Sequence, residues 1–557
     1  MKIMKIMKMW KRYKVEIVNE QYKRKSDGKI FNETRKIHFF DENDEDYKTI
    51  SYGYVTPEEV IKDIKAGKEI NLSYCYVNKL SLGLALLDIY NGRRIKVKLH
   101  NAKNAFFDGG LNFSGAEFED GKVDFTLSKF GDGDVNCEYD QFGDGKASFN
   151  RTQFGNGKVS FNWTQFGEGD VSFNETQFGE GDVSFIRTQF GTGYVSFYQT
   201  QFSEGNVSFD WTQFSEGNVN FYCATFGVQK DNSGKVLSVK GNVTFQNTKF
   251  GEGDVSFSNA KFGVQEDNSG EVLSVNGNVS FKETKFGKGD VDFSEMKVNK
   301  LSFNTMLIEQ FLNFKKATVN ELCFSNCELQ RHINATSIAK LGSLEFDECI
   351  NPGYINIRWK KNMLKKAVNR IKSKTKGYFT SRADKHNRRM ETCLLLKENF
   401  RKLGFYADED EAYYTYSKNK IRGEFWGFIA GEWHRKLNIL WATLLFIIKL
   451  IFLEIMGGFG TNPLSVFLSM IITWLSFGLF YFWRLFYCLE KFEGDSVEIL
   501  HLSKWGQAFY HSAVTFLTIG YGDLYPASAT LRVASGLEGF AGLFLMSFFT
   551  VAVVRKV

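Results

Sequence analysis

The chain has 557 residues, too many for one compact core, so two to four domains are expected. Its 70 Lys and Arg against 64 Asp and Glu give a net charge of +6, a mild excess that does not by itself indicate a nucleic-acid-binding protein. The content of only 4 Pro excludes collagen-like and proline-rich architectures, whereas the 56 Phe indicate a repeat that places Phe at a fixed position.

Residues 1–79 are the first predicted domain, an N-terminal region with a capping helix. Thr56, Pro57 and the two glutamates after them form a typical helix start, with an N-cap, a proline at the first helical position and acids in the first turn. We expect this helix to cover the exposed end of the repeat that follows. The segment MKIMKIMKMWKR lacks the apolar core of a signal peptide, and the 8 scattered Cys include no CxxC pair. Both features favour a cytoplasmic, reducing location with free thiols.

Residues 80–350 contain the repeat, a dodecad whose unit is typified by VSFNWTQFGEGD at Val159–Asp170. Alternate residues of a short strand face the same side, so the Val-x-Phe and Thr-x-Phe steps offer two inward faces. The Gly-x-Gly step is expected to make a sharp corner that only glycine adopts cheaply. Because one unit is too short to enclose two Phe side chains, we predict two units per coil, coils about 4.8 Å apart and about seven coils.

The repeat is interrupted twice and resembles a known family. The next Phe of the pattern is delayed to Phe245 after Phe226 and to Phe281 after Phe262, which predicts hairpins pushed out of the array with Asn-Ser-Gly turns. The Thr-x-Phe and Val-x-Phe steps resemble pentapeptide repeats, and this resemblance implies a right-handed, square, parallel β-solenoid. Polar positions recur rather than converge, which favours a rigid scaffold or an interaction surface over an enzyme. No cofactor is expected, and the ligand or protein partner of the solenoid is left open.

Residues 351–436 are predicted to be a basic, helical connector. Thirteen Lys and Arg lie between Arg358 and Arg389, which favours either contact with anionic lipid headgroups or a solvated basic helix. No base-reading motif accompanies the charge, so no nucleic-acid partner is expected. Apolar residues at helical spacing in Arg389–Leu403, followed by DEDEAYYTYSKNKIRGEFWG, predict two helices. The pair resembles the helical hairpin that joins pentapeptide arrays to membrane segments in bacterial proteins.

Two segments, Leu464–Tyr487 and Leu531–Val554, are long and apolar enough to span a hydrocarbon core of about 30 Å. Asn438–Met456 is also apolar but is interrupted by two charges. We therefore interpret residues 437–463 as an interfacial helix and linker, with a third membrane span as the alternative. Basic residues in the connector and at the C-terminus favour a multi-pass protein of the plasma membrane, with its N-terminal domain and C-terminus in the cytoplasm.

Between the two spans lies WGQAFYHSAVTFLTIGYGDLYP, residues 505–526, a helix-forming stretch followed by the hexapeptide Thr518–Asp523. The hexapeptide TIGYGD matches the potassium-channel signature TVGYGD, with Ile in place of Val. Residues 464–557 therefore resemble the two-helix pore domain of potassium channels, with an outer helix, a pore helix, a selectivity filter and an inner helix. Together with the solenoid, the chain resembles the bacterial ion channels that carry pentapeptide repeats.

A bare K⁺ ion needs oxygens that replace its hydration shell. The resemblance implies that the filter comprises Thr518, Ile519, Gly520, Tyr521 and Gly522, with K⁺ bound by the carbonyls of the first four and by the hydroxyl of the first. Gly520 and Gly522 permit backbone conformations that residues with side chains resist. Because one chain supplies too few oxygens, four chains must meet on an axis, and we expect an α-helical homotetrameric pore.

Further residues of the pore region are expected to support conduction. Three of them support the filter: Phe509, Tyr510 and Asp523. By resemblance, Tyr510 is placed to hydrogen-bond Asp523. On the inner helix, Gly539 and Gly542 form either a bend point or sites of close helix packing. Glu538 is costly in lipid and should face protein or water, with a hydrogen bond to another subunit or to the pore helix.

The sequence thus predicts a potassium-selective channel that conducts K⁺ passively and carries a cytoplasmic solenoid as a regulatory or scaffolding domain. No helix has Arg at every third residue, so intrinsic voltage sensing is not expected. A signal from the solenoid would enter through the connector and residues 438–463. The alternative is a membrane-anchored solenoid interaction protein with a non-conducting pore domain. No catalytic constellation is visible, so the protein is predicted not to be an enzyme.

Overall fold

The computed structural model describes most of the chain and divides it into two compact units. The described residues are 10–41, 45–83, 86–230, 236–239, 242–266, 272–359, 363–432, 436–494 and 502–555. The first unit is Met1–Arg370 and the second is Ile371–Val557. The boundary falls inside the predicted connector, because the start of that segment packs with the repeat and the remainder packs with the membrane helices.

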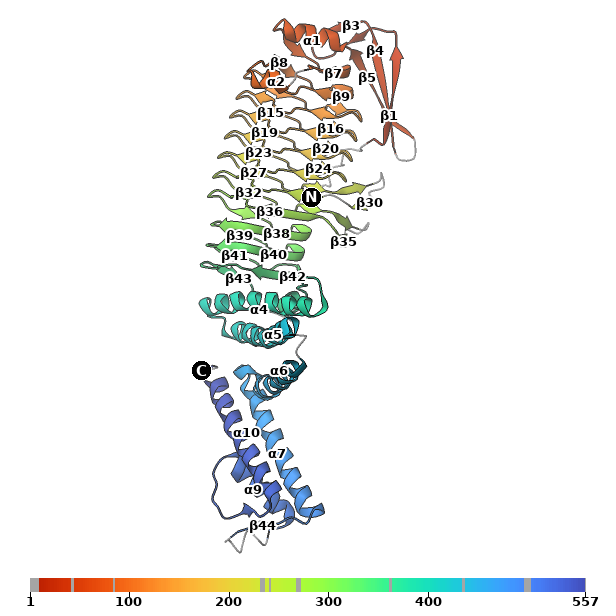
Figure 1. Cartoon of the computed structure of the whole chain (residues 1–557). Helices are drawn as coiled ribbons and strands as arrows, with labels where there is room; N and C mark the ends of the chain where they lie inside the picture. Colours follow the sequence, from red (N-terminus) through yellow and green to blue (C-terminus); the bar gives the residue numbers. More distant parts are fainter. Residues whose placement is uncertain are drawn as a thin grey trace. The chain divides into compact units, whose positions relative to one another are not determined.

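The first unit is a parallel β-solenoid of about 12 turns, stacked from red to green in Figure 1. In the regular part, one turn holds four short strands: β16 (Gln153–Phe154), β17 (Val159–Ser160), β18 (Gln165–Phe166) and β19 (Val171–Ser172). Gln153 pairs with Gln177 and Val159 with Val183, so one turn takes 24 residues. The predicted two units per coil are confirmed.

The solenoid is longer than the seven coils predicted from the Phe array. Parallel pairing begins before the array, where β6 (Glu69–Asn71) and β7 (Cys75–Ser81) already take part in it, and continues after the array in β38 (Lys297–Ile308), β40 (Thr318–Leu329) and β42 (Lys340–Asp347). In these last turns Lys297 pairs with Thr318 and Thr318 with Lys340, so each turn is shorter than a regular one. A column of stacked Phe continues there through Phe303, Phe324 and Phe346, while Leu, Val, Met and Cys fill other inward positions, so a turn does not require the dodecad unit.

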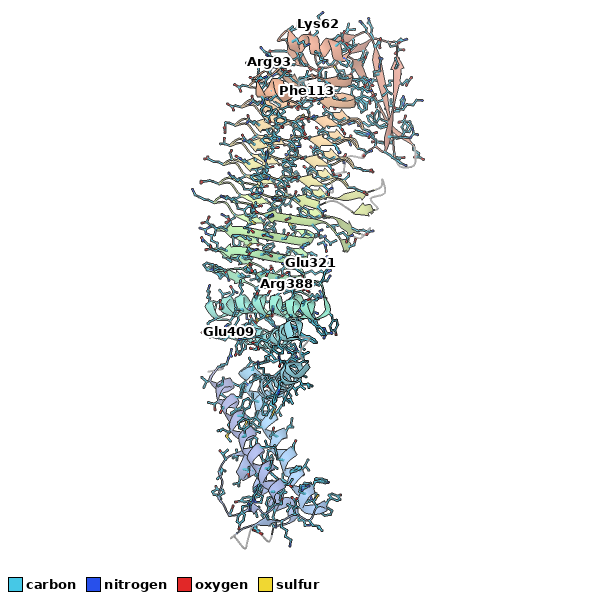
Figure 2. The ribbon with its side chains drawn as sticks, in the orientation of Figure 1. Lys62, Arg93, Phe113, Glu321, Arg388 and Glu409 are labelled. Atoms are coloured by element: carbon cyan, nitrogen blue, oxygen red, sulfur yellow. The ribbon has the colours of Figure 1, made fainter. Side chains whose placement is uncertain are left out.

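The core of the regular turns consists of stacked Phe columns, which begin near Phe113 in Figure 2. Phe161 stacks on Phe185 at 5.2 Å with nearly parallel rings, and it meets Phe173 of the neighbouring column edge to face at 5.6 Å. The Thr of each Thr-x-Phe step is buried too. Thr188 Oγ1, for example, donates to the carbonyl of Phe161 at 2.7 Å, which satisfies a buried polar group. Both inward faces predicted from the sequence are therefore confirmed.

The predicted reason for the Gly-x-Gly corner is wrong. The positive φ lies at the residue before each Thr, such as Trp163 at 60° and Arg187 at 59°, whereas Gly157 and Gly181 have no positive φ. A Cβ on Gly181 would lie 2.1 Å from the carbonyl oxygen of Gly157 in the preceding turn. Glycine is needed because neighbouring turns approach each other closely there, not because the backbone is left-handed.

Both predicted hairpins are present. β29 (Val228–Lys230) pairs with β30 (Val236–Val239) in antiparallel fashion, and β34 (Val264–Glu266) pairs with β35 (Val272–Val275) in the same way. The predicted Asn-Ser-Gly turns at their tips lie outside the described residues. Each hairpin lengthens its turn without interrupting the stack, since Val207 before the first hairpin pairs in parallel with Val243 after it.

The predicted N-terminal capping helix is confirmed as α1 (Pro57–Lys65). The Thr56 side chain accepts from the Glu59 backbone and the Glu59 side chain accepts from the Thr56 backbone, which forms a capping box. Val60 and Ile64 are buried against the first strands of the solenoid. At the other end, α3 (Met363–Asn369) packs against β42 and covers the last turn.

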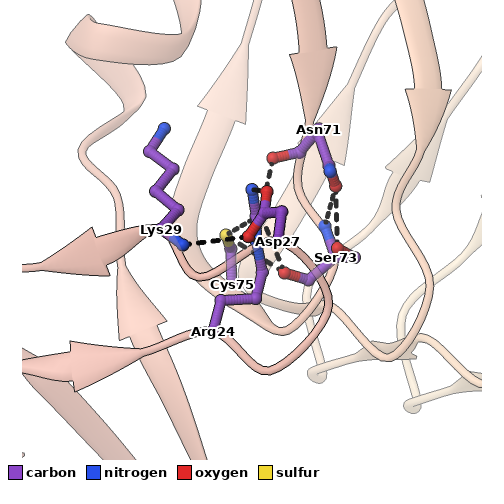
Figure 3. Close-up of polar contacts among 6 residues, drawn as sticks. All are labelled: Arg24, Asp27, Lys29, Asn71, Ser73 and Cys75. Atoms are coloured by element: carbon purple, nitrogen blue, oxygen red, sulfur yellow. Dashed lines mark hydrogen bonds and ion pairs between the residues drawn. The ribbon is translucent and has the colours of Figure 1, made fainter.

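An antiparallel sheet that the sequence analysis did not predict precedes the cap. It consists of β1 (Arg12–Val18), β4 (Thr34–Phe40) and β5 (Asp46–Tyr54), and β5 joins the solenoid by parallel pairing with β7. Buried Arg24 pairs with Asp27 and donates to the carbonyls of Asn71 and Ser73 at 2.9 and 3.1 Å (Figure 3). These bonds tie the short hairpin that follows β1 to the first turn.

The second unit is helical (Figure 1). Its helices are α4 (Tyr378–Lys402), α5 (Tyr406–Glu432), α6 (Lys436–Lys449), the π-helix η2 (Leu450–Met456), the short η3 (Gly458–Gly460), α7 (Pro463–Tyr487), α9 (Lys504–Phe516) and α10 (Ala529–Val554). The predicted helical hairpin is α4 with α5, which pack against each other. Among the described residues, three helices are long and apolar enough to cross a membrane: Asn438–Met456, Pro463–Tyr487 and Ala529–Val554.

The eight cysteines are free thiols, as the sequence predicts. Cys75, Cys137, Cys327 and Cys393 are buried in the protein. Cys137 replaces a Phe of one column and lies inside the solenoid. The buried thiols therefore act as packing residues.

Candidate functional site

The short helix α9 lies between the two long helices α7 and α10 and packs against both. It begins at Ser503, whose hydroxyl accepts from the backbone of Gly506 at 3.2 Å, and its last residue is Phe516. Trp505 in its first turn stacks on Phe482 of α7 at 4.0 Å. The chain therefore runs along α7, turns back into the short helix α9, and continues into α10.

The hexapeptide after α9 has an unusual backbone. Thr518 N–H donates to the carbonyl of Thr515 at 3.0 Å and Ile519 N–H to that of Val514 at 2.9 Å, so the chain leaves the helix in a tight turn. Then φ is positive at every second residue: 54° at Thr518, 62° at Gly520 and 77° at Gly522. Glycine adopts this region without a steric penalty, which explains its presence at two of the three positions.

The residues predicted to support the hexapeptide lie on different sides of α9. Tyr510 Oη donates to Asp523 Oδ2 at 2.5 Å, so the bond predicted by resemblance is present. Phe509 lies instead between Trp474 of α7, at 5.9 Å, and Trp505, at 5.4 Å. Phe509 therefore packs α9 against α7, and its support of the hexapeptide stays a prediction.

Glu538 is fully buried at the point where all three helices meet. Its carboxyl group is hydrogen-bonded to Ser512 of α9 and to Tyr481 of α7, the latter at 2.8 Å. The bond to the pore helix is one of the two that the sequence analysis offered. The partner on α7 was not predicted, because Tyr481 is 57 residues away and no local pattern connects it with Glu538.

The two inner-helix glycines lie in an unbroken helix, α10. A Cβ on Gly542 would lie 2.0 Å from the carbonyl oxygen of Phe516, the last residue of α9, whereas one on Gly539 would be 3.8 Å from that of Thr515. Gly542 therefore permits close packing of α10 against the end of α9. A bend at either glycine stays a prediction.

Helix α5 contacts the residue that follows α10 and the π-helix η2 that precedes α7. Neither contact was predicted from the sequence. Arg555, just after α10, forms an ion pair with Asp410 at 3.1 Å and lies over the Tyr413 ring at 4.3 Å. Further along α5, Arg422 pairs with Glu454 of η2 at 2.8 Å. One helix thus binds the end of α10 and the segment that precedes α7.

The basic connector is only partly a free charged surface. Arg388 and Arg389 donate to the carbonyls of Lys372 and Ile371, and burial lowers the pKa of Arg389. Arg382 lies over the rings of Tyr378 and Trp426. These three cations have partners inside the second unit, so fewer than the thirteen counted from the sequence are available for lipid.

Residues 469–557 match a protein-family model described as an ion channel. No curated protein and no solved structure matches the chain. The matched segment covers most of α7 and all of α9, the hexapeptide and α10. The chain therefore carries an ion-channel domain in its C-terminal part, which a helical connector joins to the N-terminal β-solenoid, and its apolar helices indicate a membrane protein.

Proposed function

We propose that the protein is a potassium-selective channel in which four chains conduct K⁺ passively through the hexapeptide TIGYGD. The observation that carries the proposal is the backbone of Thr518–Asp523, with positive φ at every second residue. In a regular β-strand, successive carbonyls point to opposite sides. A positive φ at every second residue instead turns successive peptide groups the same way, so the carbonyls form a row.

Such a row suits a dehydrated monovalent cation. The carbonyls of Thr518, Ile519, Gly520 and Tyr521 replace part of the hydration shell, and the Thr518 hydroxyl adds a further oxygen. The carbonyl end of α9 faces the same region and places the negative end of its dipole near the ion. Substitution of Ile519 for Val retains a β-branched residue, so selectivity for K⁺ is expected.

Assembly of four chains follows from the same geometry. One row of oxygens contacts an ion from one side only, and four rows around an axis complete its coordination. In the single chain, Ile519 and Tyr521 are 48% and 69% exposed, although both are large and apolar or aromatic. Neighbouring subunits would cover these side chains and hold the filter at its working width. We therefore expect a homotetramer.

The contacts of α6 and η2 favour an interfacial position over a third membrane span. Lys449 pairs with Glu424 at 3.1 Å, and Glu454 pairs with Lys418 and Arg422. Their partners lie on α5, a helix with too many charges to enter a bilayer. Because α6 and η2 run along α5, they lie at the membrane surface. The solenoid and the C-terminus are then both on the cytoplasmic side of the plasma membrane.

Regulation of the pore is proposed to enter through α5. This helix binds Arg555 at the end of α10 through Asp410, so a movement of the helical hairpin changes the position of the inner helix. The solenoid acts as the regulatory or scaffolding domain that binds a partner. The remaining basic residues of the connector are proposed to contact anionic lipid headgroups.

The test is ion flux into liposomes that contain the full-length protein. Wild type is expected to take up K⁺ and to exclude Na⁺. Gly520→Ala places a Cβ on a residue with φ of 62° and is expected to abolish K⁺ flux. Gly427→Ala is the matched control, because Gly427 lies in α5 with open space around it and no positive φ, and it should conduct normally.

The same experiment distinguishes the channel from the alternative function. A membrane-anchored interaction protein with a non-conducting pore domain would insert and assemble but would carry no K⁺. Equal flux of K⁺ and Na⁺ through wild type would contradict the proposed selectivity. Unchanged K⁺ flux through Gly520→Ala would show that the hexapeptide is not the conducting path.

A further inference from the structure

The contacts between oxygen atoms around Glu538 require one proton more than the neighbouring hydroxyl groups can supply if Glu538 is charged. Ser512 Oγ contacts two oxygens, the carbonyl of Trp474 at 3.0 Å and one carboxyl oxygen of Glu538. Tyr481 Oη contacts the other carboxyl oxygen at 2.8 Å and lies at a longer 3.4 Å from Ser535 Oγ. The two contacts of Glu538 and the contact of Ser512 with Trp474 therefore need three protons. The hydroxyls of Ser512 and Tyr481 supply two, because each hydroxyl carries one donor hydrogen.

The third proton belongs on Glu538. A charged carboxylate only accepts, so the single hydrogen of Ser512 would serve either Glu538 or the Trp474 carbonyl, and the other contact would have no hydrogen between its two oxygens. A protonated Glu538 donates to Ser512, Ser512 donates to the Trp474 carbonyl, and Tyr481 donates to Glu538. Every contact then has one hydrogen, and no charge is buried among the helices.

The surroundings supply no cation as a partner in the described part of the chain. The titratable groups that face Glu538 are Tyr481 on α7 and His511 on α9, and the His511 ring is hydrogen-bonded to Ser535 of α10 at 2.8 Å. Arg484 on α7 is paired with Glu490 in the loop after that helix. An uncompensated carboxylate inside a membrane protein is strongly unfavourable, which agrees with the proton count.

We propose that Glu538 is protonated in the conducting channel and is a positioning residue for the filter. It holds Ser512, one turn before the end of α9, while Gly542, one turn further along α10, contacts the Phe516 carbonyl. These two points fix the last turn of the pore helix, and the filter begins directly after it. This inference rests on the proposed function, since it assigns Glu538 a part in holding the potassium filter.

The first test is independent of conduction. The infrared spectrum of the full-length protein in lipid should contain the C=O stretching band of a protonated carboxyl group at neutral pH, and Glu538→Gln should lose that band. Glu398→Gln removes an exposed carboxylate of α4 and should leave the band unchanged. Identical protonated-carboxyl bands in wild type and Glu538→Gln would overturn the proposal.

The second test uses the ratio of K⁺ to Na⁺ permeability. Gln is neutral and has both a donor and an acceptor, so Glu538→Gln should stay within about twofold of wild type, whereas Glu538→Ala should lower the ratio about tenfold or more. High pH should lower the ratio of wild type reversibly, because ionisation removes the proton shared with Ser512, and Glu538→Gln should not respond. A Gln variant as impaired as the Ala variant would contradict a neutral positioning role. A wild-type chain without K⁺ flux would contradict the proposed function, and the infrared band would still decide the protonation of Glu538.

Discussion

Lys129 is a buried lysine at a position where the next three turns of the solenoid carry Gln. It lies on β12 (Lys129–Phe130), pairs in register with Gln153, and is only 5% exposed. Its ammonium group is 5.9 Å from the Trp10 ring and 5.8 Å from the Phe39 ring, so the N-terminal sheet covers it. Burial, with a smaller repulsion from Lys48, lowers the pKa of Lys129 from 10.5 to about 7.

This residue predicts a dependence of stability on pH. Between about pH 7 and pH 10.5 the unfolded chain binds more protons at Lys129 than the folded chain, so the stability of wild type rises with pH across this range. Below pH 7 the folded state carries the full cost of the buried charge. Lys129→Gln should remove that rise with pH and should increase the free energy of unfolding by about 1–3 kcal/mol near pH 6.

The measurement is urea unfolding of the full chain at several pH values, with hydrogen exchange of Arg12–Val18 as a local probe. Lys146→Gln is the control, because the Lys146 side chain is 48% exposed and should give the same pH profile as wild type. If the free energy of unfolding of Lys129→Gln rises with pH between pH 7 and pH 10 as steeply as that of wild type, the pH dependence does not arise from Lys129.

At this scale the sequence predicted local features well and distant partners poorly. The left-handed backbone at Gly520 and Gly522 follows from a short motif, because φ depends on the residue itself. The partners of Glu538 could not be predicted, because Ser512 and Tyr481 reach it only after three helices have packed. The role of Lys129 was missed for the same reason, although its replacement of Gln in the repeat was a visible signal.

Among the elements, the corners of the solenoid are where turns come closest. The second glycine of each corner is Gly throughout the regular turns, whereas the first position also holds Ser203 and Ser215. Ser203 Oγ donates to the Phe178 carbonyl of the preceding turn at 2.8 Å, so that position accepts a small polar side chain. A Cβ at either position would meet the backbone of the preceding turn, since one on Gly191 would lie 2.1 Å from the Gly167 carbonyl oxygen, but only the first position carries a side chain in the regular turns.

We therefore predict that the two positions differ in tolerance. Gly181→Ala would place a Cβ 2.1 Å from the Gly157 carbonyl oxygen and should destabilise the solenoid by about 2–4 kcal/mol. Gly191→Ser would also place a Cβ 2.1 Å from a carbonyl oxygen, that of Gly167, but Ser203 and Ser215 show that the corner can adjust to serine at this position, so it should cost less than Gly181→Ala. Thermal unfolding followed by the β-sheet signal measures both variants, and equal losses would contradict this account of the corner.

The period of the solenoid was predictable and its length was not. Phe at alternating spacings of five and seven predicts a turn made of two units, which the pairing of Gln153 with Gln177 confirms. The turns formed by β38, β40 and β42 keep a Phe column but are shorter than 24 residues, so a count based on the five-and-seven spacing ends too early. The sheet of β1, β4 and β5 was missed although Arg12–Val18 alternates charged with apolar or aromatic residues, which is the pattern of a half-buried strand.

Over the whole molecule, we propose α5 as the element through which the solenoid acts on the pore. Asp410→Arg and Arg555→Asp each replace an ion pair with two like charges and should change the open probability of single channels by about threefold to thirtyfold. The double variant restores opposite charges and should return toward wild type. The exchange of Asp63 and Lys68, an exposed pair of the N-terminal cap, is the control and should have no effect. Additive effects of Asp410→Arg and Arg555→Asp in the double variant would contradict coupling through this ion pair.

Selective conduction by the assembled filter is the central claim for the molecule as a whole. Its most direct measurement is the reversal potential of the reconstituted full-length protein in a bilayer with K⁺ on one side and Na⁺ on the other. A row of carbonyls from each of four chains predicts a shift of at least about 59 mV in favour of K⁺, which corresponds to a tenfold preference. A reversal potential of zero, with current carried equally by both ions, would contradict the account.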